Sequence, residues 1–236
     1  MIIEVTGEPG IGKTTLLREI CDKIYYKPIL FSDDLILKYF KIDFIKPVFL
    51  RRISSDIILF LIFLPQFKKY KVFLLFVLNT LKNIHERKIF KINILRNLIL
   101  KFGRFEFISK NLNHKIVIVD EGISHIPFNL IDYYGEKEID LESVFAPLAS
   151  IVSKVKVVLL YHKSMDTKLR LMQRGHKRIK QNPNYSVEQF VRLNKQVADA
   201  YKLMPPGRFL DKFTLELNEE INMENLIKFF ERITEK

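Results

Sequence analysis

Short β-branched apolar runs alternate along this chain with longer segments of helical periodicity. The runs predict strands at residues 1–6, 29–31, 115–120, 155–161 and 213–217. The run inside 115–120 is Ile-Val-Ile-Val without polar alternation, which is typical of strands buried on both faces of a parallel sheet. Strands that alternate with helices predict an α/β fold, with a mostly parallel sheet covered by helices on both faces.

Three segments outside these runs have the periodicity of amphipathic helices. They are residues 13–25, 186–204 and 223–234. Ser186 begins an S-x-x-Q capping box, and Asn222 is a favourable N-cap for the last helix. Both caps support the predicted helix starts.

A long helical region separates the second and third predicted strands. Residues 35–113 contain one glycine, Gly103, and two prolines, Pro47 and Pro65, in a background of Leu, Ile, Phe and Lys. We predict several helices interrupted near the prolines. With no repeat or Gly/Ser linker in view, residues 1–236 are interpreted as one domain with a large helical insertion.

Charge is concentrated in that insertion. The chain has a net charge of +12, yet residues 35–115 hold 17 Lys and Arg against 4 Asp and Glu, a balance of +13. The rest of the chain is close to neutral, at −1. Such a field favours anionic partners, namely small anionic molecules or nucleotides.

Composition excludes several classes of protein. The apolar share of 48% and charged share of 28% are those of a globular chain. Cys21 is alone, which excludes an intrachain disulfide and a cysteine zinc site and favours a reducing, cytoplasmic setting. We expect no secretory signal, and no apolar run reaches the ~18–20 residues that span a bilayer.

The insertion is both apolar and basic. Segments 57–64 and 72–78 are apolar on every side, and Lys68, Lys69 and Lys71 lie between them. One interpretation is helices buried in an acceptor-binding subdomain. The other is a hairpin that dips into the inner face of a membrane, with its lysines at anionic headgroups. No recognised module accompanies the charge, so no specific nucleic acid partner is expected.

The most informative motif follows the first predicted strand. Residues 7–14 have the sequence GEPGIGKT, which matches GxxxxGK[ST] and opens a predicted helix. In such a loop, backbone N–H groups cradle phosphates, Lys13 reaches the β- and γ-phosphates, and the Thr14 hydroxyl binds Mg²⁺. The predicted phosphate-binding residues are Gly7, Glu8, Pro9, Gly10, Ile11, Gly12, Lys13, Thr14 and Thr15.

An acidic pair ends the third predicted strand. Asp120 has the position of the acid that organises Mg²⁺ together with Thr14. Glu121 has three open roles: positioning a water for hydrolysis, supporting the metal site, or holding the acceptor. His125 is close enough in sequence to face the acceptor, and a structural histidine is the alternative.

A basic helix end follows the fourth predicted strand. Arg170 and Arg174 are four residues apart, and Arg178 lies just beyond Gly175. Guanidinium groups that close over a transferred phosphoryl group stabilise its developing charge. We predict catalytic and nucleotide-binding roles for Arg170 and Arg174, and substrate binding for Arg178.

With these motifs, the chain resembles the small P-loop kinases, the nucleoside and nucleoside-monophosphate kinase group that includes thymidylate kinase. The resemblance rests on GEPGIGKTT, on IVIVDEG, and on Arg170-x3-Arg174-Gly175. It implies a three-layer P-loop NTPase sandwich with a five-stranded parallel sheet, and Mg·ATP as donor. It also implies an acceptor held by the insertion and a lid over about 166–184. A homodimer is a possible assembly.

The acceptor end of the pattern leaves alternatives open. The resemblance implies that an acidic residue at the end of the second strand, Asp33 or Asp34, acts as the base toward an acceptor hydroxyl. The alternative is that Ser32 and Asp33 only cap the next helix. If the acceptor is already a phosphate, Arg51 and Arg52 become the anion clamp. The expected activity is γ-phosphoryl transfer to a nucleoside, nucleotide or sugar-type metabolite. The rival is an ATPase coupled to a protein or membrane partner, with Glu121 activating water.

Overall fold

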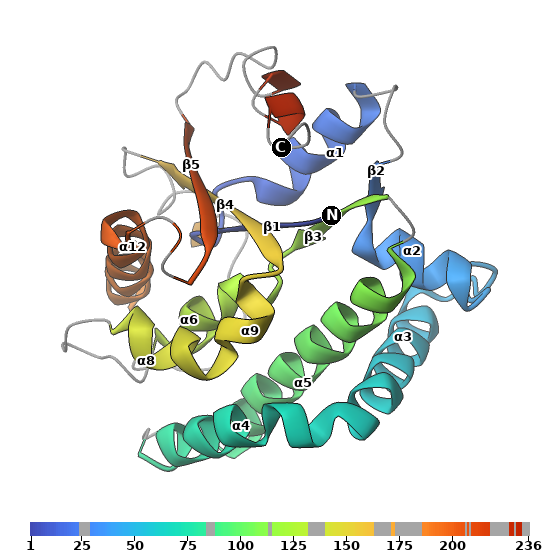
Figure 1. Ribbon diagram of the computed structural model, residues 1–236, viewed down its shortest axis with the longest axis horizontal. Coiled ribbons are helices and arrows are strands. Elements are labelled where there is room, and N and C mark those ends of the chain that lie inside the picture. Colours follow the sequence, from blue (N-terminus) through green and yellow to red (C-terminus); the bar gives the residue numbers. More distant parts are fainter. Residues whose placement is uncertain are drawn as a thin grey trace.

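Five strands form one sheet in the order β2-β3-β1-β4-β5, and every pairing is parallel (Figure 1). Their bounds are β1 Ile2–Gly7, β2 Ile29–Phe31, β3 Ile116–Asp120, β4 Val155–His162 and β5 Asp211–Leu217. The predicted fold class is therefore confirmed. The computed structural model describes residues 1–23, 29–83, 88–112, 115–131, 140–162, 171–172, 186–205, 207, 209–217, 227–228 and 230–232.

Each face of the sheet is buried under its own set of helices. Ile3 and Val5 of β1 point to one face, where Leu17 of α1 and Phe230 near the C-terminus cover them. Ile2 points to the opposite face, which packs on the insertion and on the helices that follow β3. Because successive side chains of a strand point to opposite faces, an uninterrupted apolar strand such as Ile116–Asp120 needs cover on both sides.

Helices fill the connections between the strands. Their bounds are α1 Lys13–Lys23, α2 Ser32–Tyr39, α3 Val48–Phe63, α4 Phe67–Lys82, α5 Lys88–Asn111, α6 Ile126–Asn129, α8 Leu141–Phe145, α9 Ala149–Val152 and α12 Val187–Leu203, with short 3₁₀ turns η1 Leu64–Gln66, η2 Ile123–His125 and η3 Ala146–Leu148. The sequence pattern did not predict the short helices between β3 and β4. Helix α12 begins at the predicted capping box, where the Ser186 side chain accepts the N–H of Gln189.

The insertion between β2 and β3 consists of α2, α3, α4 and α5, with breaks where the prolines predict them (Figure 1). Helix α3 packs on α5, and the contact is closest at Gly103, where a Cβ atom would lie 2.1 Å from the backbone oxygen of Leu59. Only a residue without a side chain allows the two backbones to approach this closely. None of the helices within the described ranges combines the length and the apolar character that crossing a bilayer requires.

Much of the apolar surface of the insertion remains exposed. Helices α3 and α4 bury side chains such as Leu59, Phe63 and Phe73, but their other faces also carry apolar residues. Of the eighteen large apolar side chains that are exposed in the described part of the chain, sixteen belong to this region: Tyr39, Phe44, Val48, Phe49, Leu50, Ile53, Ile57, Phe60, Leu61, Leu64, Phe67, Val72, Leu75, Leu78, Ile89 and Ile92.

Candidate active site

The loop between β1 and α1 has the backbone conformation of a phosphate cradle. Gly10 and Gly12 have φ values of 83° and 93°, in the region that L-residues with side chains rarely adopt. Gly7 has φ 147°, and a Cβ there would lie 2.2 Å from the backbone oxygen of Leu160. The loop leads directly into the N-terminus of α1, whose free N–H groups and dipole favour an anion.

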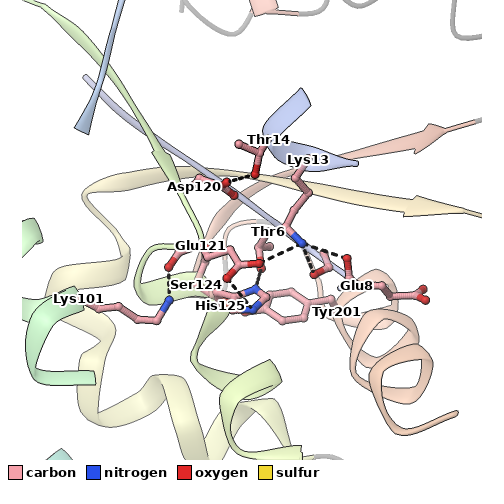
Figure 2. Close-up of polar contacts among 11 residues, drawn as sticks. Thr6, Glu8, Lys13, Thr14, Lys101, Asp120, Glu121, Ser124, His125 and Tyr201 are labelled. Carbon is pink, nitrogen blue, oxygen red and sulfur yellow. Dashed lines mark hydrogen bonds and ion pairs between the residues drawn. The ribbon is translucent and has the colours of Figure 1, made fainter. Parts of the chain in front are cut away.

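Lys13 lies folded against its own loop. Its ammonium group donates to the backbone oxygens of Gly7 and Glu8, at 3.1 and 3.0 Å, and forms an ion pair with Glu121 at 3.2 Å (Figure 2). The side chain is 5% exposed. The lysine is thus held beside the loop by polar partners that a bound phosphate can replace.

Thr14, in the first turn of α1, is in contact with Asp120, the last residue of β3. The Thr14 hydroxyl donates to Oδ2 of Asp120 at 2.6 Å (Figure 2). The other oxygen, Oδ1, is buried and lacks a hydrogen-bond partner among the described residues. Burial raises the pKa of Asp120, against the opposing effect of the Thr14 hydrogen bond.

This pair fits Mg²⁺. A hydroxyl and a carboxylate with an unused oxygen are hard oxygen donors, and Mg²⁺ in kinases takes few protein ligands because phosphates and water complete its shell. In the described part of the chain, no cluster of three or more His, Cys, Asp or Glu residues offers a fuller metal site. The hydrogen bond between Thr14 and Asp120 thus brings the two predicted Mg²⁺ ligands together.

Glu121 lies among three basic groups. Its carboxylate contacts Lys13 and, at 3.6 Å, Nε2 of His125, while its backbone oxygen accepts from Lys101 of α5 (Figure 2). Burial opposes ionisation, but the charges of His125, Lys13 and Lys101 prevail and hold the pKa of Glu121 below its ordinary value. Glu121 has φ 56°, a backbone conformation that residues other than glycine seldom adopt.

A buried carboxylate fixes the turn that carries Glu121. Glu4 of β1 is 1% exposed and accepts the N–H groups of Ile123 and Ser124, at 3.0 and 2.7 Å. Gly122 permits this approach, because a Cβ there would lie 2.3 Å from the Glu4 carboxyl carbon. Tyr201 of α12 donates to the backbone oxygen of Ser124 and holds the turn from the other side. The sequence analysis did not identify Glu4 as a candidate, since a single acidic residue in a predicted strand is no signal of a functional site.

His125 is buried and does not line the cleft described below, which favours the structural histidine of the two predicted alternatives. The ring is 4% exposed, lies within 3.0 Å of the Thr6 hydroxyl through Nδ1, and stacks on Phe128 at 4.8 Å. It lies next to the Glu121 carboxylate (Figure 2). The reason is local: the chain after Gly122 turns into η2 and directs this side chain into the core rather than along the sheet edge.

A cleft of 710 Å³ opens beside Asp120 and Glu121, between the sheet edge and the insertion. Its walls come from α1, α2, α3 and α5, and they are mainly polar. The lining residues are Arg18, Asp33, Leu37, Val48, Arg51, Arg52, Ser55, Asp56, Arg96, Asn97, Leu100, Lys101, Arg104, Asp120, Glu121 and Asn129. Six of them are basic. The cleft therefore presents positive charge to the place where the predicted metal pair lies.

The structure separates the two candidate bases. Asp33 lines this cleft and forms an ion pair with Arg104 of α5 at 2.9 Å. Asp34 does not line this cleft but an adjoining cavity of 510 Å³, which Asp33, Thr14 and Asp120 also line. The capping alternative is wrong: Phe31 is the N-cap of α2, without a side-chain cap hydrogen bond. The pairing of Asp33 with Arg104 is a non-local contact that the strand-end pattern did not reveal.

The predicted anion clamp, Arg51 and Arg52, lines the same cleft from α3. Lys101, which the sequence did not indicate, joins them from α5, and burial lowers its pKa to about 8. The predicted lid arginines, Arg170, Arg174 and Arg178, lie outside the described residues, and their roles stay predictions.

Comparisons with known proteins found similar solved structures only. No family model and no curated protein matches this sequence. The similar solved structures include a deoxyadenosine kinase from M. mycoides with products dCMP and dCDP, at 17% identity and TM-score 0.47, with 100% of this chain and 99% of that chain covered. A shikimate kinase from Bacteroides thetaiotaomicron has 14% identity and TM-score 0.40, with 100% and 99% covered. An uncharacterized protein from Eubacterium ventriosum has 10% identity and TM-score 0.39, with 100% and 98% covered.

At these identities and scores the similarity assigns no role to any residue. The function is argued below from the geometry of this chain.

Proposed function

We propose that this protein is an ATP- and Mg²⁺-dependent kinase that transfers the γ-phosphoryl group to a small molecule bound in the 710 Å³ cleft. One observation carries the proposal: Asp120 both contacts Thr14 of the phosphate loop and lines that cleft. A donor phosphate on the loop and an acceptor in the cleft then meet at the same carboxylate. This adjacency is the arrangement that direct transfer needs.

The roles of the residues follow from their positions. The loop backbone and Lys13 bind the β- and γ-phosphates, so that Lys13 exchanges its carbonyl partners and Glu121 for phosphate oxygens. Thr14 and Asp120 would hold Mg²⁺, which neutralises charge between the two phosphates. Arg51 and Arg52 orient the acceptor from α3.

The transfer itself breaks one bond and forms one. The bond between the γ-phosphorus and the β,γ-bridging oxygen breaks as an acceptor oxygen bonds to phosphorus, and ADP leaves. For a hydroxyl acceptor, Asp33 takes the proton; for a phosphate acceptor, no proton is removed. The Arg104 guanidinium holds Asp33 toward the cleft while it does so.

The ATPase alternative assigns water activation to Glu121. In this structure both oxygens of that carboxylate have basic partners, Lys13 and His125. A carboxylate with both oxygens held in this way and a lowered pKa is a weaker base than Asp33, whose ion pair with Arg104 involves Oδ1 and whose side chain is 70% exposed. The cleft also gives the kinase a place for an acceptor. These two observations favour the kinase.

The deciding experiment is ADP release from Mg·ATP, with and without a desalted pool of cellular metabolites. We expect release that depends on the pool, and mass spectrometry of the products then names the acceptor. Release that ignores the pool would instead support the ATPase and direct attention to Glu121.

A variant ties this activity to the loop. Lys13→Ala should lower turnover by at least 10²-fold, because one charge-stabilising donor at a reacting phosphate contributes on that order. Lys71→Ala is the control, since Lys71 is an exposed lysine of α4 outside the cleft. Turnover is measured by ADP release and folding by circular dichroism. A folded Lys13→Ala variant with full activity would contradict the proposal.

A further inference from the structure

Helix α4 carries apolar residues on two opposite sides; it lies at the lower edge of the view in Figure 1. One side packs into the protein through Tyr70, Phe73 and Val77, each of which is 1% exposed or less. On the other side, Val72 and Leu75 are 71% and 55% exposed. The buried side is sufficient to hold the helix in the fold, so the exposed apolar side calls for a separate explanation.

Lysines share this exposed side with the apolar residues. The set recurs at spacings of three and four positions, which places its members on one side of the helix. We call this set the α4 face. Its members, all exposed, are Lys68, Lys71, Val72, Leu75, Leu78 and Lys82.

The positive charge of the α4 face is not neutralised by neighbouring side chains. The helix Phe67–Lys82 contains no acidic residue. Among the described residues, Lys69 is the lysine of α4 that forms an ion pair, with Glu106 of α5 at 2.5 Å. The structure thus separates Lys69, which is held by α5, from Lys68 and Lys71, which remain at the surface.

A partner for the α4 face has to offer negative charge and hydrocarbon side by side. A two-fold contact with a second copy through α4 would set lysines against lysines. A nucleic acid supplies phosphates but leaves Val72 and Leu75 against a polar backbone. An anionic bilayer supplies both, because its headgroups attract lysines and its acyl chains lie just below them. Charge complementarity together with the exposed apolar residues therefore favours the bilayer.

We propose that the α4 face docks this protein on the surface of an anionic membrane. Val72, Leu75 and Leu78 enter the outer part of the acyl-chain region, and the lysines stay at the headgroups. The helix lies parallel to the bilayer plane, so its opposite side keeps its packing in the fold. The docking does not depend on the kinase function proposed above, since α4 contributes no residue to the 710 Å³ cleft.

Vesicle co-sedimentation with the full-length protein tests the docking. One set of vesicles is an equal mixture of phosphatidylcholine and phosphatidylglycerol, and the other is phosphatidylcholine alone. Each lysine near an anionic surface strengthens binding about fivefold, so we expect at least about tenfold tighter binding to the mixed vesicles. Equal binding to both vesicle types, or binding to neither, would overturn the inference.

Salt gives a second readout on the same vesicles. Raising NaCl from about 0.1 M to about 1 M shortens the screening length from about 10 Å to about 3 Å. Binding to the mixed vesicles should weaken strongly over this range, because the lysines contribute through charge. Binding that salt leaves unchanged would contradict a role for the lysines.

Two pairs of substitutions separate charge from hydrocarbon. Lys68→Gln with Lys71→Gln should weaken binding to the mixed vesicles about tenfold or more. Val72→Gln with Leu75→Gln should weaken it by a similar factor, because two apolar side chains no longer leave water. Circular dichroism checks that both variants fold, and the two pairs test the face independently. Wild-type binding in both folded variants would overturn the inference.

The matched control lies away from α4. Lys154→Gln with Leu203→Gln changes one exposed lysine and one leucine that is 84% exposed. This variant should bind the mixed vesicles as the wild type does. If it loses as much binding as the α4 pairs, the attraction is a property of the whole surface and the α4 face is not the docking site.

Other occupants of the α4 face give different results. A dimer that the Val72→Gln and Leu75→Gln pair converts to a monomer in analytical ultracentrifugation, with vesicle binding unchanged, would show that a second copy covers the face. A single-stranded RNA of mixed sequence that displaces the protein from the mixed vesicles, and whose binding the Val72→Gln and Leu75→Gln pair leaves intact, would indicate a nucleic-acid surface. Either result overturns the inference.

The kinase proposal is tested separately from the docking. Without vesicles, ADP release by the α4 variants should equal that of the wild type, because the substitutions lie outside the cleft. A wild type that binds the mixed vesicles but has no kinase activity supports the docking and contradicts only the function proposed above. Kinase activity without vesicle binding has the opposite meaning.

Discussion

Glu4 shows how one buried side chain connects two segments of the proposed active site. It belongs to the strand that leads into the phosphate loop, and its two oxygens accept N–H groups from the turn that follows Asp120 and Glu121. The carboxylate therefore joins the donor loop to the acidic pair. Its role in the reaction is to position residues, without contact to the substrate.

Replacing Glu4 tests this link. Glu4→Gln retains the shape but leaves one acceptor oxygen for two N–H donors, so one N–H faces an amide NH₂ group. We expect a loss of about 1–3 kcal/mol in the free energy of unfolding. Glu19→Gln, an exposed position on α1, is the control and should change stability by less than about 0.5 kcal/mol. Urea denaturation measures both, and equal stability of the two variants would refute the role.

The two aspartates after β2 make a second matched pair. With a hydroxyl acceptor, Asp33→Asn should lower kcat by roughly 10²–10⁴-fold, as expected for loss of a general base. Asp34→Asn should lower kcat by a smaller factor, because Asp34 does not line the cleft. Steady-state kinetics with saturating Mg·ATP measures both values. The reverse ranking would assign the base to Asp34.

Helix α5 determines the shape of the cleft in which we propose that the acceptor binds. It contributes Arg96, Lys101 and Arg104 to the cleft, and it packs against α3 at Gly103. One helix thus fixes the distance between the opposite walls of the cleft. A change in its packing should affect stability and acceptor binding together.

Gly103→Ala tests the α3–α5 contact. The new Cβ would meet the backbone oxygen of Leu59 at 2.1 Å, and backbone cannot rotate away as a side chain can. We expect a loss of at least about 1–3 kcal/mol in the free energy of unfolding, with weaker acceptor binding. Ser109→Ala, at an exposed position of α5, is the control. If Gly103→Ala matches this control in thermal and urea denaturation, the helices are not in close contact.

The contact between α4 and α5 has a pH dependence of its own. Tyr70 is fully buried and donates to Oε1 of Glu106 at 2.5 Å, and Lys69 binds the same oxygen. Burial, with the Glu106 hydrogen bond and charge, raises the pKa of Tyr70 above its usual 10. The folded protein then keeps this proton at a pH where the unfolded chain loses it. Stability is present below pH 10 and falls above it.

Tyr70→Phe removes this titration. At pH 9 the variant should be less stable than the wild type, because the hydrogen bond to Glu106 is lost. Between pH 10 and 11 the difference should narrow by about 1 kcal/mol, since one pH unit corresponds to 1.36 kcal/mol for one proton. Urea denaturation at pH 9, 10 and 11 measures the difference. A constant difference would show that Tyr70 titrates normally.

Sequence patterns predicted what is local and periodic. The phosphate loop, Asp120 at a strand end and the capping box at Ser186 are each specified by residues a few positions apart, so their elements could be placed before the structure. Arg104 and Lys101 could not, because their contacts to Asp33 and Glu121 depend on how α5 lies against the sheet. His125 shows the same limit, since nearness in sequence to Asp120 does not decide which side of a turn a ring occupies.

Across the whole molecule, charge and apolar surface have a common location. The balance of +13 between residues 35 and 115 and sixteen large exposed apolar side chains both belong to the insertion. The other layers are closer to neutral and well covered. The sheet with its loops thus supplies the donor chemistry, and the insertion supplies the surface that distinguishes this chain.

The pairing of β2 with β3 has a consequence for engineering. Phe31, where the chain leaves the sheet, is in register with Ile118, only two residues after Ile116, where the chain returns. The insertion is therefore one contiguous segment whose two ends are anchored on adjacent strands. Exchanging it for the corresponding stretch of another protein with this fold would leave the strand order and the phosphate loop intact. Under the proposed function, acceptor specificity would be transferred together with this segment.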